Sequence, residues 1–467
     1  MKLPSVPALG HTPHVHDALV QLLGPEKVST AGEVLATHAT DRWHASARPD
    51  AVVFAESTDD IVRTLTFAHE RKIPVTTRGA GVGYVGGCVP QEGGLALSLA
   101  RMNRILELNP HDGVAVVEPG VITGDLQEAA HAIGWYYPPD PASLKECSLG
   151  GNIATNAGGP RCLKYGVTRP YVLGLEVVLA DGTLLPCGSR CHKNKTGFDL
   201  VGLFVGSEGM LGVVSKATLR LIPHPECRAM LTATFARFPE AAHAVQRILN
   251  SGHLPSALEI TDGFTLRAAR DYLGPSALPE GDAHLIVEID GRQAAVESER
   301  VEIAELLEGL GALAVEHHRD DAACEAIWQL RRDFSYSLRH TGLTKLNEDI
   351  VVPRSKLVDL VEFARRLQDS TGIAIACFGH AGDGNIHTNL MVENYADPDI
   401  RANADKALDQ LFSWILRNEG VITGEHGVGL AKKRWFDEAV GQASVRTHAA
   451  MKAALDPEGI LNPGKFI

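Results

Sequence analysis

The amino-acid sequence predicts an α+β protein built from more than one domain. With 467 residues, the chain is too long for one ordinary hydrophobic core and long enough for two or three domains. In the first half, apolar strands at residues 51–54 and 73–77 flank an amphipathic helix that Ser57 is expected to cap. Further along, strands at residues 173–179 and 183–186 flank an Asp-Gly turn, which is a strong hairpin signal.

The second half has a different pattern and predicts a separate domain. From about Leu231 the glycine density falls, and amphipathic helices alternate with strands. The expected helices cover residues 239–250 and 297–310, and the expected strands cover 231–235, 284–289 and 312–315. Helices laid on an antiparallel sheet are typical of an α+β domain. We therefore expect a domain boundary near residue 228.

Charge and composition narrow the class of protein. Lys and Arg number 44 against 57 Asp and Glu, and the formal charge of -13 disfavours nucleic acid or an anionic membrane as a partner. The chain starts with Met1-Lys2-Leu3-Pro4 and has no apolar run of roughly eighteen residues, so we expect a cytoplasmic protein without a transmembrane segment. The eight cysteines form no C-x-x-C pair, which indicates neither a disulfide framework nor an iron-sulfur site.

A glycine-rich loop follows the strand at residues 73–77. Gly81 to Gly86 match G-x-G-x-x-G, but the loop leads to Pro90 and another strand, and not to the helix that a Rossmann site requires. Five glycines in the nine residues 79–87 let backbone N–H groups turn inward as an anion nest, to which Arg78 adds charge. We expect a diphosphate here, and a flexible surface turn is the alternative.

A second glycine-rich block covers residues 148–159. Apart from Leu149 and Ile153 it carries only small residues and amide or hydroxyl groups. Such a segment lets a flat ligand lie against the backbone, whereas ordinary loop hydrogen bonding is the alternative.

Polar, metal-competent residues gather in a hairpin near the C-terminal end. Strands at 373–378 and 386–392 flank a glycine-rich turn at 379–385, and His387 and Asn389 project to one face because strand side chains alternate. A second cluster holds Glu425 and His426. Two histidines and a carboxylate form a catalytic-type metal set, because a structural site would normally close with a fourth protein ligand. The alternative is a pair of hairpin histidines bonded to backbone carbonyls.

Six of these blocks together carry a family resemblance. Residues 77–87, 138–159, 204–213, 379–389, 424–427 and 462–465 keep the order seen in FAD-binding oxidoreductases of the vanillyl-alcohol-oxidase or PCMH superfamily. The chain resembles the branch of D-lactate dehydrogenase, D-2-hydroxyglutarate dehydrogenase and the glycolate oxidase FAD subunit, over nearly all residues from Arg48 to Ile467. The resemblance implies a PCMH-type, two-subdomain FAD-binding domain (residues 1–228), an α+β cap domain with an antiparallel sheet (229–423), and a C-terminal segment (424–467) that returns to the FAD domain.

The resemblance also implies which residues hold the cofactor. The diphosphate would be wrapped by Arg78, Gly79, Ala80, Gly81, Val82, Gly83 and Tyr84. The flavin and ribityl chain would be lined by Asp140, Ser148, Gly151, Asn152 and Thr155, with Gly212, Val213 and Asn462 also meeting the cofactor. Val82 and Val85 stand where the family often has hydroxyl residues. Because neither loop offers a histidine for a covalent flavin bond, we expect FAD to be held non-covalently.

In the resembled family a W-x-L-R helix supplies a carboxylate-binding arginine, which here is Arg331. The planar guanidinium suits a carboxylate because it donates two parallel hydrogen bonds, and pairing with Asp333 or Glu325 on a solvated helix face is the alternative. By the same resemblance, His380, His387 and Glu425 hold a divalent metal, Asn389 places the substrate, and His426 is the base. Zinc suits His and Glu ligands, with manganese, iron and cobalt left open.

The function expected from this resemblance is an FAD-dependent dehydrogenase that converts a D-2-hydroxy acid to a 2-oxo acid. Arg331 and the metal would hold the substrate, and His426 would remove the hydroxyl proton as hydride moves to flavin N5. The acceptor would be a quinone, a cytochrome, an electron-transfer flavoprotein or an iron-sulfur partner subunit, with membrane attachment only through a partner and a homodimer left open. The rivals are an electron-transfer subunit of a larger complex, a non-haem iron oxygenase and a metal hydrolase.

Overall fold

The computed structural model describes residues 13–467 and divides the chain into two compact units. Unit 1 comprises the chain up to Gly158, then Val167–His224 and Glu425–Ile467. Unit 2 comprises Gly159–Gly166 and Pro225–Gly424. Met1 to Pro4, on which the expectation of a cytoplasmic protein partly depends, lie outside the described residues. No helix within residues 13–467 is both long enough and apolar enough to span a membrane.

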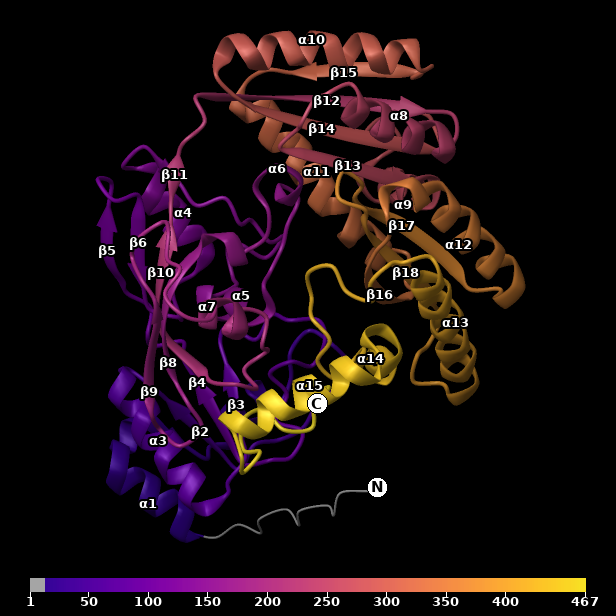
Figure 1. Cartoon of the computed structure of the whole chain (residues 1–467). Coiled ribbons are helices and arrows are strands. Elements are labelled where there is room, and N and C mark those ends of the chain that lie inside the picture. Colours follow the sequence, from indigo (N-terminus) through magenta and orange to yellow (C-terminus); the bar gives the residue numbers. More distant parts are fainter. Residues whose placement is uncertain (1–12) are drawn as a thin grey trace. The chain divides into compact units, whose positions relative to one another are not determined.

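Unit 1 contains two larger sheets (Figure 1). The first, in the order β1-β2-β4-β3, pairs β4 in parallel with both β2 and β3. The second, in the order β5-β6-β10-β8-β9, is antiparallel throughout, and a short pair joins β11 to β7. The strands are β1 (Val28–Ser29), β2 (Ala51–Phe54), β3 (Val75–Arg78), β4 (Leu95–Ser98), β5 (Ile105–Asn109), β6 (Val114–Val117), β7 (Trp135–Tyr136), β8 (Val172–Val178), β9 (Leu184–Gly188), β10 (Val213–Arg220) and β11 (Ile222–Pro223).

Several helices of unit 1, among them α3, α5 and α7, pack against these sheets. Helix α3 begins where Ser57 accepts a hydrogen bond from the Asp60 backbone, as predicted, and it buries Ile61 and Leu65 in a core shared with β2 and β4. Fully burying such a side chain contributes about 1.5–3 kcal/mol. The helices are α1 (Pro13–Leu23), α2 (Gly32–Thr37), α3 (Thr58–Arg71), α4 (Thr123–His131), α5 (Leu149–Thr155), α7 (Leu200–Phe204), α14 (Lys433–Val440) and α15 (Gln442–Leu455), with 3-10 turns η1 (Pro25–Lys27) and η2 (Arg169–Tyr171).

Unit 2 is built on one antiparallel sheet of seven strands among the described residues, in the order β15-β12-β14-β13-β17-β18-β16. Figure 1 shows α8, α10 and α12 beside this sheet. The strands are β12 (Cys227–Phe235), β13 (Ala257–Asp262), β14 (Ala283–Gly291), β15 (Ala314–His318), β16 (Thr344–Val351), β17 (Ala374–His380) and β18 (Asn385–Val392). The helices are α6 (Cys162–Tyr165), α8 (Phe238–Asn250), α9 (Gly263–Leu273), α10 (Gln293–Gly309), α11 (Asp321–His340), α12 (Leu357–Thr371) and α13 (Pro398–Arg417), with the 3-10 turn η3 (Arg354–Lys356).

The predicted α+β class with an antiparallel sheet in the second domain is confirmed. The unit boundaries fall at residues 224/225 and 424/425, beside the expected 228/229 and 423/424. One segment differs, because Gly159–Gly166 belongs to unit 2 although it was expected in the first domain. Its side chains explain this placement, since Arg161 bonds to Glu288 and both Lys164 and Tyr165 bond to Asp290.

Candidate active site

His380 and His387 face each other across the hairpin of β17 and β18 in unit 2. His380 is the last residue of β17, and its ring centroid lies 5.5 Å from that of His387, at an interplanar angle of 80°. The turn between the strands is tight: Gly384 has φ +86°, and a Cβ there would lie 2.1 Å from the Val352 carbonyl oxygen. The hairpin therefore brings the two predicted ligands together, with His380 on the strand and not in the turn where it was expected.

Glu425 completes a set of three groups that fit a metal ion. One ligand atom from each of His380, His387 and Glu425 lies within 4.8 Å of the others. Glu425 directly follows Gly424, the last residue of unit 2. Ligands held at about 2.1 Å around a tetrahedral zinc ion lie about 3.4 Å apart, which is within the 4.8 Å limit of this set. The donor chemistry, two imidazoles and a carboxylate, suits a divalent cation.

A buried carboxylate, Asp349, holds the chain just before Glu425. Asp349 lies on β16 directly opposite His387, and it is 0% exposed. Its Oδ2 accepts hydrogen bonds from Gly424 N and Thr423 Oγ1, each 2.9 Å long, and its Oδ1 accepts one of 2.7 Å from Asn385 Nδ2. The stretch that leads into Glu425 is thus tied to the same strand pair as His387.

A second buried carboxylate, Glu259 on β13, joins His380 to Arg331. Its Oε1 lies 2.5 Å from His380 Nδ1, and its Oε2 accepts a 2.6 Å bond from Arg331 Nε. A carboxylate can only accept, so Nδ1 of His380 carries the proton, and Nε2 bears the lone pair that could ligate a metal. Burial acts to raise the pKa of Glu259, but the charges of His380 and Arg331 outweigh it and lower the pKa to about 2.

Arg331 lies on α11 and is buried, with its guanidinium 4.7 Å from the centroid of the Phe378 ring. The alternative of Arg331 on a solvated helix face, paired with Asp333 or Glu325, is wrong, because Arg331 is buried and its Nε bonds to Glu259. Within residues 13–467, only Nε of Arg331 bonds to a carboxylate, so both terminal nitrogens remain available to an anion.

Lys345 adds a second cation that the sequence reading did not single out. It lies on β16, and its Nζ donates a 2.7 Å hydrogen bond to Ser335 Oγ. Burial lowers the pKa of Lys345 to about 7, with smaller contributions from the charges of Arg339 and Arg331. No carboxylate of the described chain pairs with this amine, so an anionic ligand would supply the missing charge.

Asn389 occupies the same face of the sheet as His387. Its Nδ2 donates to the carbonyl oxygens of Ala376 (3.1 Å) and His387 (3.0 Å). Its Oδ1, like the Oδ1 of Asn347 directly opposite on β16, is buried and has no hydrogen-bond partner in the described part of the chain. Buried acceptors normally have partners, so this pair suits a ligand or water that donates.

The glycine-rich loop of unit 1 comprises Gly79, Ala80, Gly81, Val82, Gly83 and Tyr84 and is braced from both sides. Arg78 Nη1 donates to the Thr40 carbonyl oxygen at 2.6 Å and to Cys88 Sγ at 3.3 Å. Asp41, which the sequence reading missed, accepts a 2.8 Å bond from Gly86 N, and Arg42 N donates to the Gly83 carbonyl oxygen at 2.9 Å. These contacts tie the loop and its flanks to residues 40–42.

The second glycine-rich block forms a helix against this loop. Ser148 caps α5 by accepting from Gly151 N, and a Cβ added to Gly79 would lie 2.3 Å from Ser148 Oγ. Thr155 donates within α5 to the Gly151 carbonyl oxygen, and Asn152 donates to Thr123. The two predicted cofactor-binding blocks are therefore packed together, with some of their polar side chains engaged inside the protein.

Among the other predicted cofactor residues of unit 1, Asn462 carries an orphaned polar atom. Asn462 donates to the carbonyl oxygens of Gly87 and Glu208, while its Oδ1 is buried without a partner among the described residues, as is Thr77 Oγ1. These atoms suit a polar ligand over the loop, which fits FAD. Asp140 is buried, Gly212 precedes β10, and Val213 pairs with Val178 inside the sheet.

His426, the predicted base, stacks on Tyr84 of the glycine-rich loop. Their ring centroids are 5.2 Å apart at 27°, and His426 Nε2 lies 4.0 Å from Glu425 Oε1. The residues that follow are held by Glu208, whose carboxylate accepts from Val428 N at 2.7 Å and from Gly429 N at 2.9 Å. The sequence does not single out Glu208, because nothing local indicates that it binds a segment more than 200 positions away.

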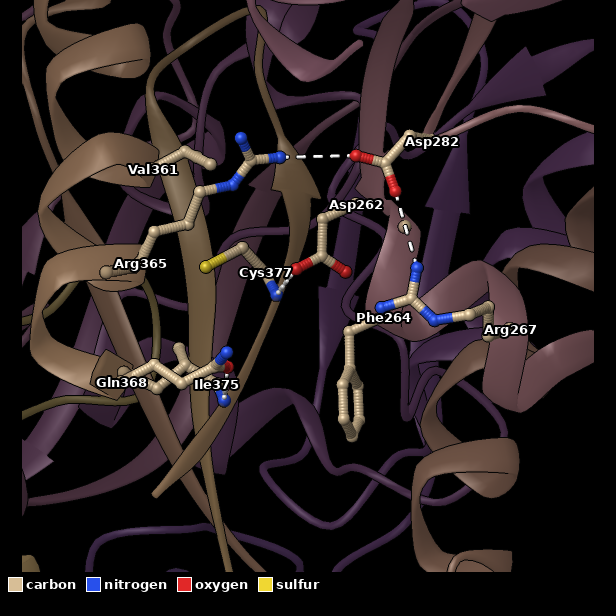
Figure 2. A pocket seen from close by; sticks show the side chains of 11 residues that line it. Asp262, Phe264, Arg267, Asp282, Val361, Arg365, Gln368, Ile375 and Cys377 are labelled. Carbon is tan, nitrogen blue, oxygen red and sulfur yellow. Dashed lines mark hydrogen bonds and ion pairs between the residues drawn. The ribbon is translucent and has the colours of Figure 1, made fainter. Parts of the chain in front are cut away.

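Unit 2 also has a cavity of about 130 Å³ on the opposite face of β17 (Figure 2). Cys377 and Ile375 line it, and both point away from the side of Phe378 and His380 because side chains alternate along a strand. Figure 2 shows Asp282 joined to Arg365 and Arg267, by ion pairs of 3.2 and 3.4 Å. The cavity is thus separate from the group of His380 and His387.

Two family models match the chain. One is described as the C-terminal domain of FAD linked oxidases and covers residues 224–466, and the other, described as an FAD binding domain, covers residues 49–188. Glycolate oxidase subunit GlcD of Bacillus subtilis (strain 168) is 38% identical, with 97% of both chains covered. GlcD of Escherichia coli (strain K12) is 35% identical over 95% of this chain and 89% of the relative. D-lactate dehydrogenase of Anaerostipes hadrus is 31% identical over 95% of both.

Solved structures share the fold at low identity. p-Cresol methylhydroxylase with substrate bound aligns with a TM-score of 0.80 at 18% identity, covering 97% of this chain and 96% of that one. Alkyldihydroxyacetonephosphate synthase aligns with a TM-score of 0.75 at 19% identity, covering 98% of this chain and 86% of that one. At such identities the likeness concerns the fold alone, and it confirms the predicted PCMH-type architecture.

Proposed function

Because this chain belongs to the FAD-linked oxidases, we propose that it oxidises a D-2-hydroxy acid to the corresponding 2-oxo acid in an FAD-dependent reaction. Membership agrees with the resemblance inferred from the sequence blocks. The relatives' names, glycolate oxidase subunit and D-lactate dehydrogenase, point to small hydroxy acids as the substrate class. The observation that carries the proposal is the metal-competent group of His380, His387 and Glu425 beside the Arg331–Glu259 pair in unit 2.

Four side chains would bind the substrate and take its proton. Arg331 and Lys345 would hold the substrate carboxylate, because both are cations with donors to spare. Asn389 would accept from the substrate through its orphaned Oδ1. His426 would take the hydroxyl proton, a task that suits an imidazole at neutral pH.

Two bound groups would supply the rest of the chemistry. FAD, when bound to the glycine-rich blocks, accepts the hydride equivalent. A divalent cation at His380, His387 and Glu425 would act as a Lewis acid that makes the substrate hydroxyl more acidic, and zinc is the metal that suits these ligands best. Two relatives are named as subunits, which favours an acceptor reached through a partner protein such as an iron-sulfur subunit.

Anaerobic reduction of the bound flavin tests the proposed function. Purified holoprotein should lose its yellow colour when mixed with D-lactate, D-2-hydroxyglutarate or glycolate, and L-lactate should reduce it far more slowly. Protein that takes up no FAD would overturn the proposal. Reduction by a chemical donor but by no hydroxy acid would instead favour an electron-transfer subunit.

The role of His426 can be tested on its own. His426→Asn should keep FAD and metal content but reduce the flavin on the order of 100-fold to 10,000-fold more slowly with a hydroxy acid, the usual contribution of a positioned base. Stopped-flow absorbance in a single turnover measures this rate. An unchanged rate in the variant would show that another group takes the proton.

A further inference from the structure

We propose that Glu259 couples the metal site of this enzyme to its substrate-carboxylate site, so that filling one site tightens the other. The inference rests on the proposed function, because it needs a cation at His380 and His387 and an anion at Arg331. Glu259 itself would contact neither the metal nor the substrate. It acts as a positioning residue that divides one negative charge between two functional groups.

The geometry gives each oxygen of Glu259 one partner. Oε1 lies 2.5 Å from Nδ1 of His380, and Oε2 lies 2.6 Å from Nε of Arg331. The side chain of Glu259 is 0% exposed, so water does not screen its interactions with His380 and Arg331. Among the described residues these two groups are its only side-chain partners. When the hydrogen bond to one of them strengthens, the negative charge that Glu259 presents to the other decreases.

On the histidine side, the carboxylate makes His380 a better ligand. A hydrogen bond from Nδ1–H to a carboxylate fixes the imidazole tautomer and raises the basicity of Nε2. When Nε2 ligates a cation, the Nδ1–H becomes a stronger donor and draws charge toward Oε1. Less charge then remains at Oε2 to neutralise Arg331.

On the arginine side, the same redistribution favours an anion. A guanidinium that is less neutralised by Glu259 attracts a ligand carboxylate more strongly, and an anion bound to Arg331 weakens the hold of Arg331 on Oε2. Glu259 then has more charge to offer His380. Both directions have the same sign, as linkage requires for two binding equilibria.

Zinc affinity with and without a carboxylate probe tests the coupling. The zinc dissociation constant of the FAD-loaded protein would be measured by competition with a chromophoric chelator, in the absence and presence of propionate. Propionate lacks the 2-hydroxyl group, so it can occupy the carboxylate site without reducing the flavin, and inhibition of D-lactate oxidation first establishes its occupancy. We expect propionate to tighten zinc by about 5-fold or more, the lower range of measured couplings.

Glu259→Gln should remove the coupling. The amide has one acceptor oxygen and cannot serve His380 and Arg331 together, so zinc should bind about 10-fold to 100-fold more weakly and propionate should no longer change its affinity. Glu288→Gln is the matched control, because Glu288 is an equally buried carboxylate on β14 that bonds to Arg161 and Trp328. Its zinc affinity and its propionate effect should equal those of the wild type.

The outcomes separate the coupling from the proposed function. If the wild-type protein binds no zinc and its flavin is not reduced by hydroxy acids, both the coupling and the proposed function are wrong. Protein that binds zinc and is reduced, but whose zinc affinity ignores propionate or keeps its response in Glu259→Gln, would overturn the coupling alone. Should Glu259→Gln not fold, Arg331→Gln offers a second measurement: zinc should bind at least as tightly as in the wild type, because Glu259 then serves His380 alone, and weaker binding would contradict the proposal.

Discussion

Lys345 is a cation without a carboxylate partner in the described chain, beside the arginine that we assign to the substrate. Burial, with the charges of Arg339 and Arg331, lowers its pKa to about 7. The amine is therefore charged at pH 6 and largely neutral above pH 8. If it holds the substrate carboxylate, the KM for a hydroxy acid should rise as the pH increases through about 7.

Lys345→Met should weaken substrate binding without destabilising the folded protein at low pH. Hydrogen bonds to charged groups contribute about 1.5–3 kcal/mol, so the KM for the hydroxy acid should increase by about 10-fold or more. The free energy of unfolding of the variant should increase at low pH, although its substrate binding weakens. The folded state binds fewer protons than the unfolded state between about pH 7 and the unfolded pKa of 10.5, so the Lys345 contribution to stability rises with pH across that window and is least favourable below pH 7.

Thermal unfolding at pH 6 and steady-state kinetics measure the two effects. The variant should unfold at a higher temperature than the wild type while binding the acid more weakly. Lys356→Met is the matched control, because Lys356 is a more exposed lysine of unit 2 that pairs with Asp359. An unchanged KM in Lys345→Met would show that the amine does not meet the substrate.

Single residues differed in how far the sequence could predict them. His380, His387 and Glu425 were found because each stands in a short polar motif, and the structure brings them together. Glu259 had no such signal, since it lies within a buried strand and meets His380 from 121 positions away. Lys345 was missed for a related reason: its burial on β16 and the nearby charges of Arg339 and Arg331, which lower its pKa, follow from the fold and not from the local sequence.

At the scale of elements, the segment between Gly424 and α14 depends on Glu208. The Glu208 carboxylate accepts from Val428 N and Gly429 N, and Val85 accepts from Leu430 N and Ala431 N. Glu208 is itself tied to α5, because its N–H donates to the Ala154 carbonyl oxygen. His426 stands two residues before Val428. The Glu208 carboxylate therefore holds the backbone that follows the proposed base.

Glu208→Gln should slow catalysis without emptying the flavin site. The amide cannot accept from both backbone N–H groups, and one unsatisfied buried donor costs about 1–3 kcal/mol of stability. Displacement of His426 should slow flavin reduction by on the order of 10-fold to 100-fold. Stopped-flow reduction and FAD content measure the two effects, with Glu118→Gln as the control because buried Glu118 binds Arg104. Loss of FAD together with activity would instead indicate a general structural role.

The elements themselves show which patterns a sequence reveals. The hairpin of β17 and β18 was predicted because apolar alternation and a glycine-rich turn are local signals. Helix α5 was read only as a small-residue block, because its glycines are poor helix formers. Its ends are nevertheless set by Ser148 as N-cap and by Asn156, which takes the left-handed conformation at φ 51°. Strand β13 was also missed, although it supplies Glu259.

At the scale of the whole molecule, the chain passes between its units at four places, and two of them lie within four residues of an expected boundary. The boundaries near residues 224 and 424 coincide with changes in glycine density and with a polar motif. The segment Gly159–Gly166 carries no such change in composition. Its membership of unit 2 follows from contacts of Arg161 and Lys164 with acids more than 120 positions away, which a local pattern cannot reveal.

Hydrogen exchange should show that Gly159–Gly166 unfolds with unit 2. The amides of Tyr165 and Gly166 are hydrogen-bonded within this segment, to the carbonyl oxygens of Arg161 and Cys162. As denaturant rises, their exchange should merge with that of β12 and β14, and not with that of neighbouring α5.

Arg161→Met leaves the Glu288 carboxylate without its main cation and should destabilise unit 2 by about 3 kcal/mol. The Tyr165 and Gly166 amides should then exchange early, whereas Arg190→Met, which removes exposed ion pairs of unit 1, should leave their exchange unchanged. Exchange of these amides together with α5 in the wild type would contradict the assignment.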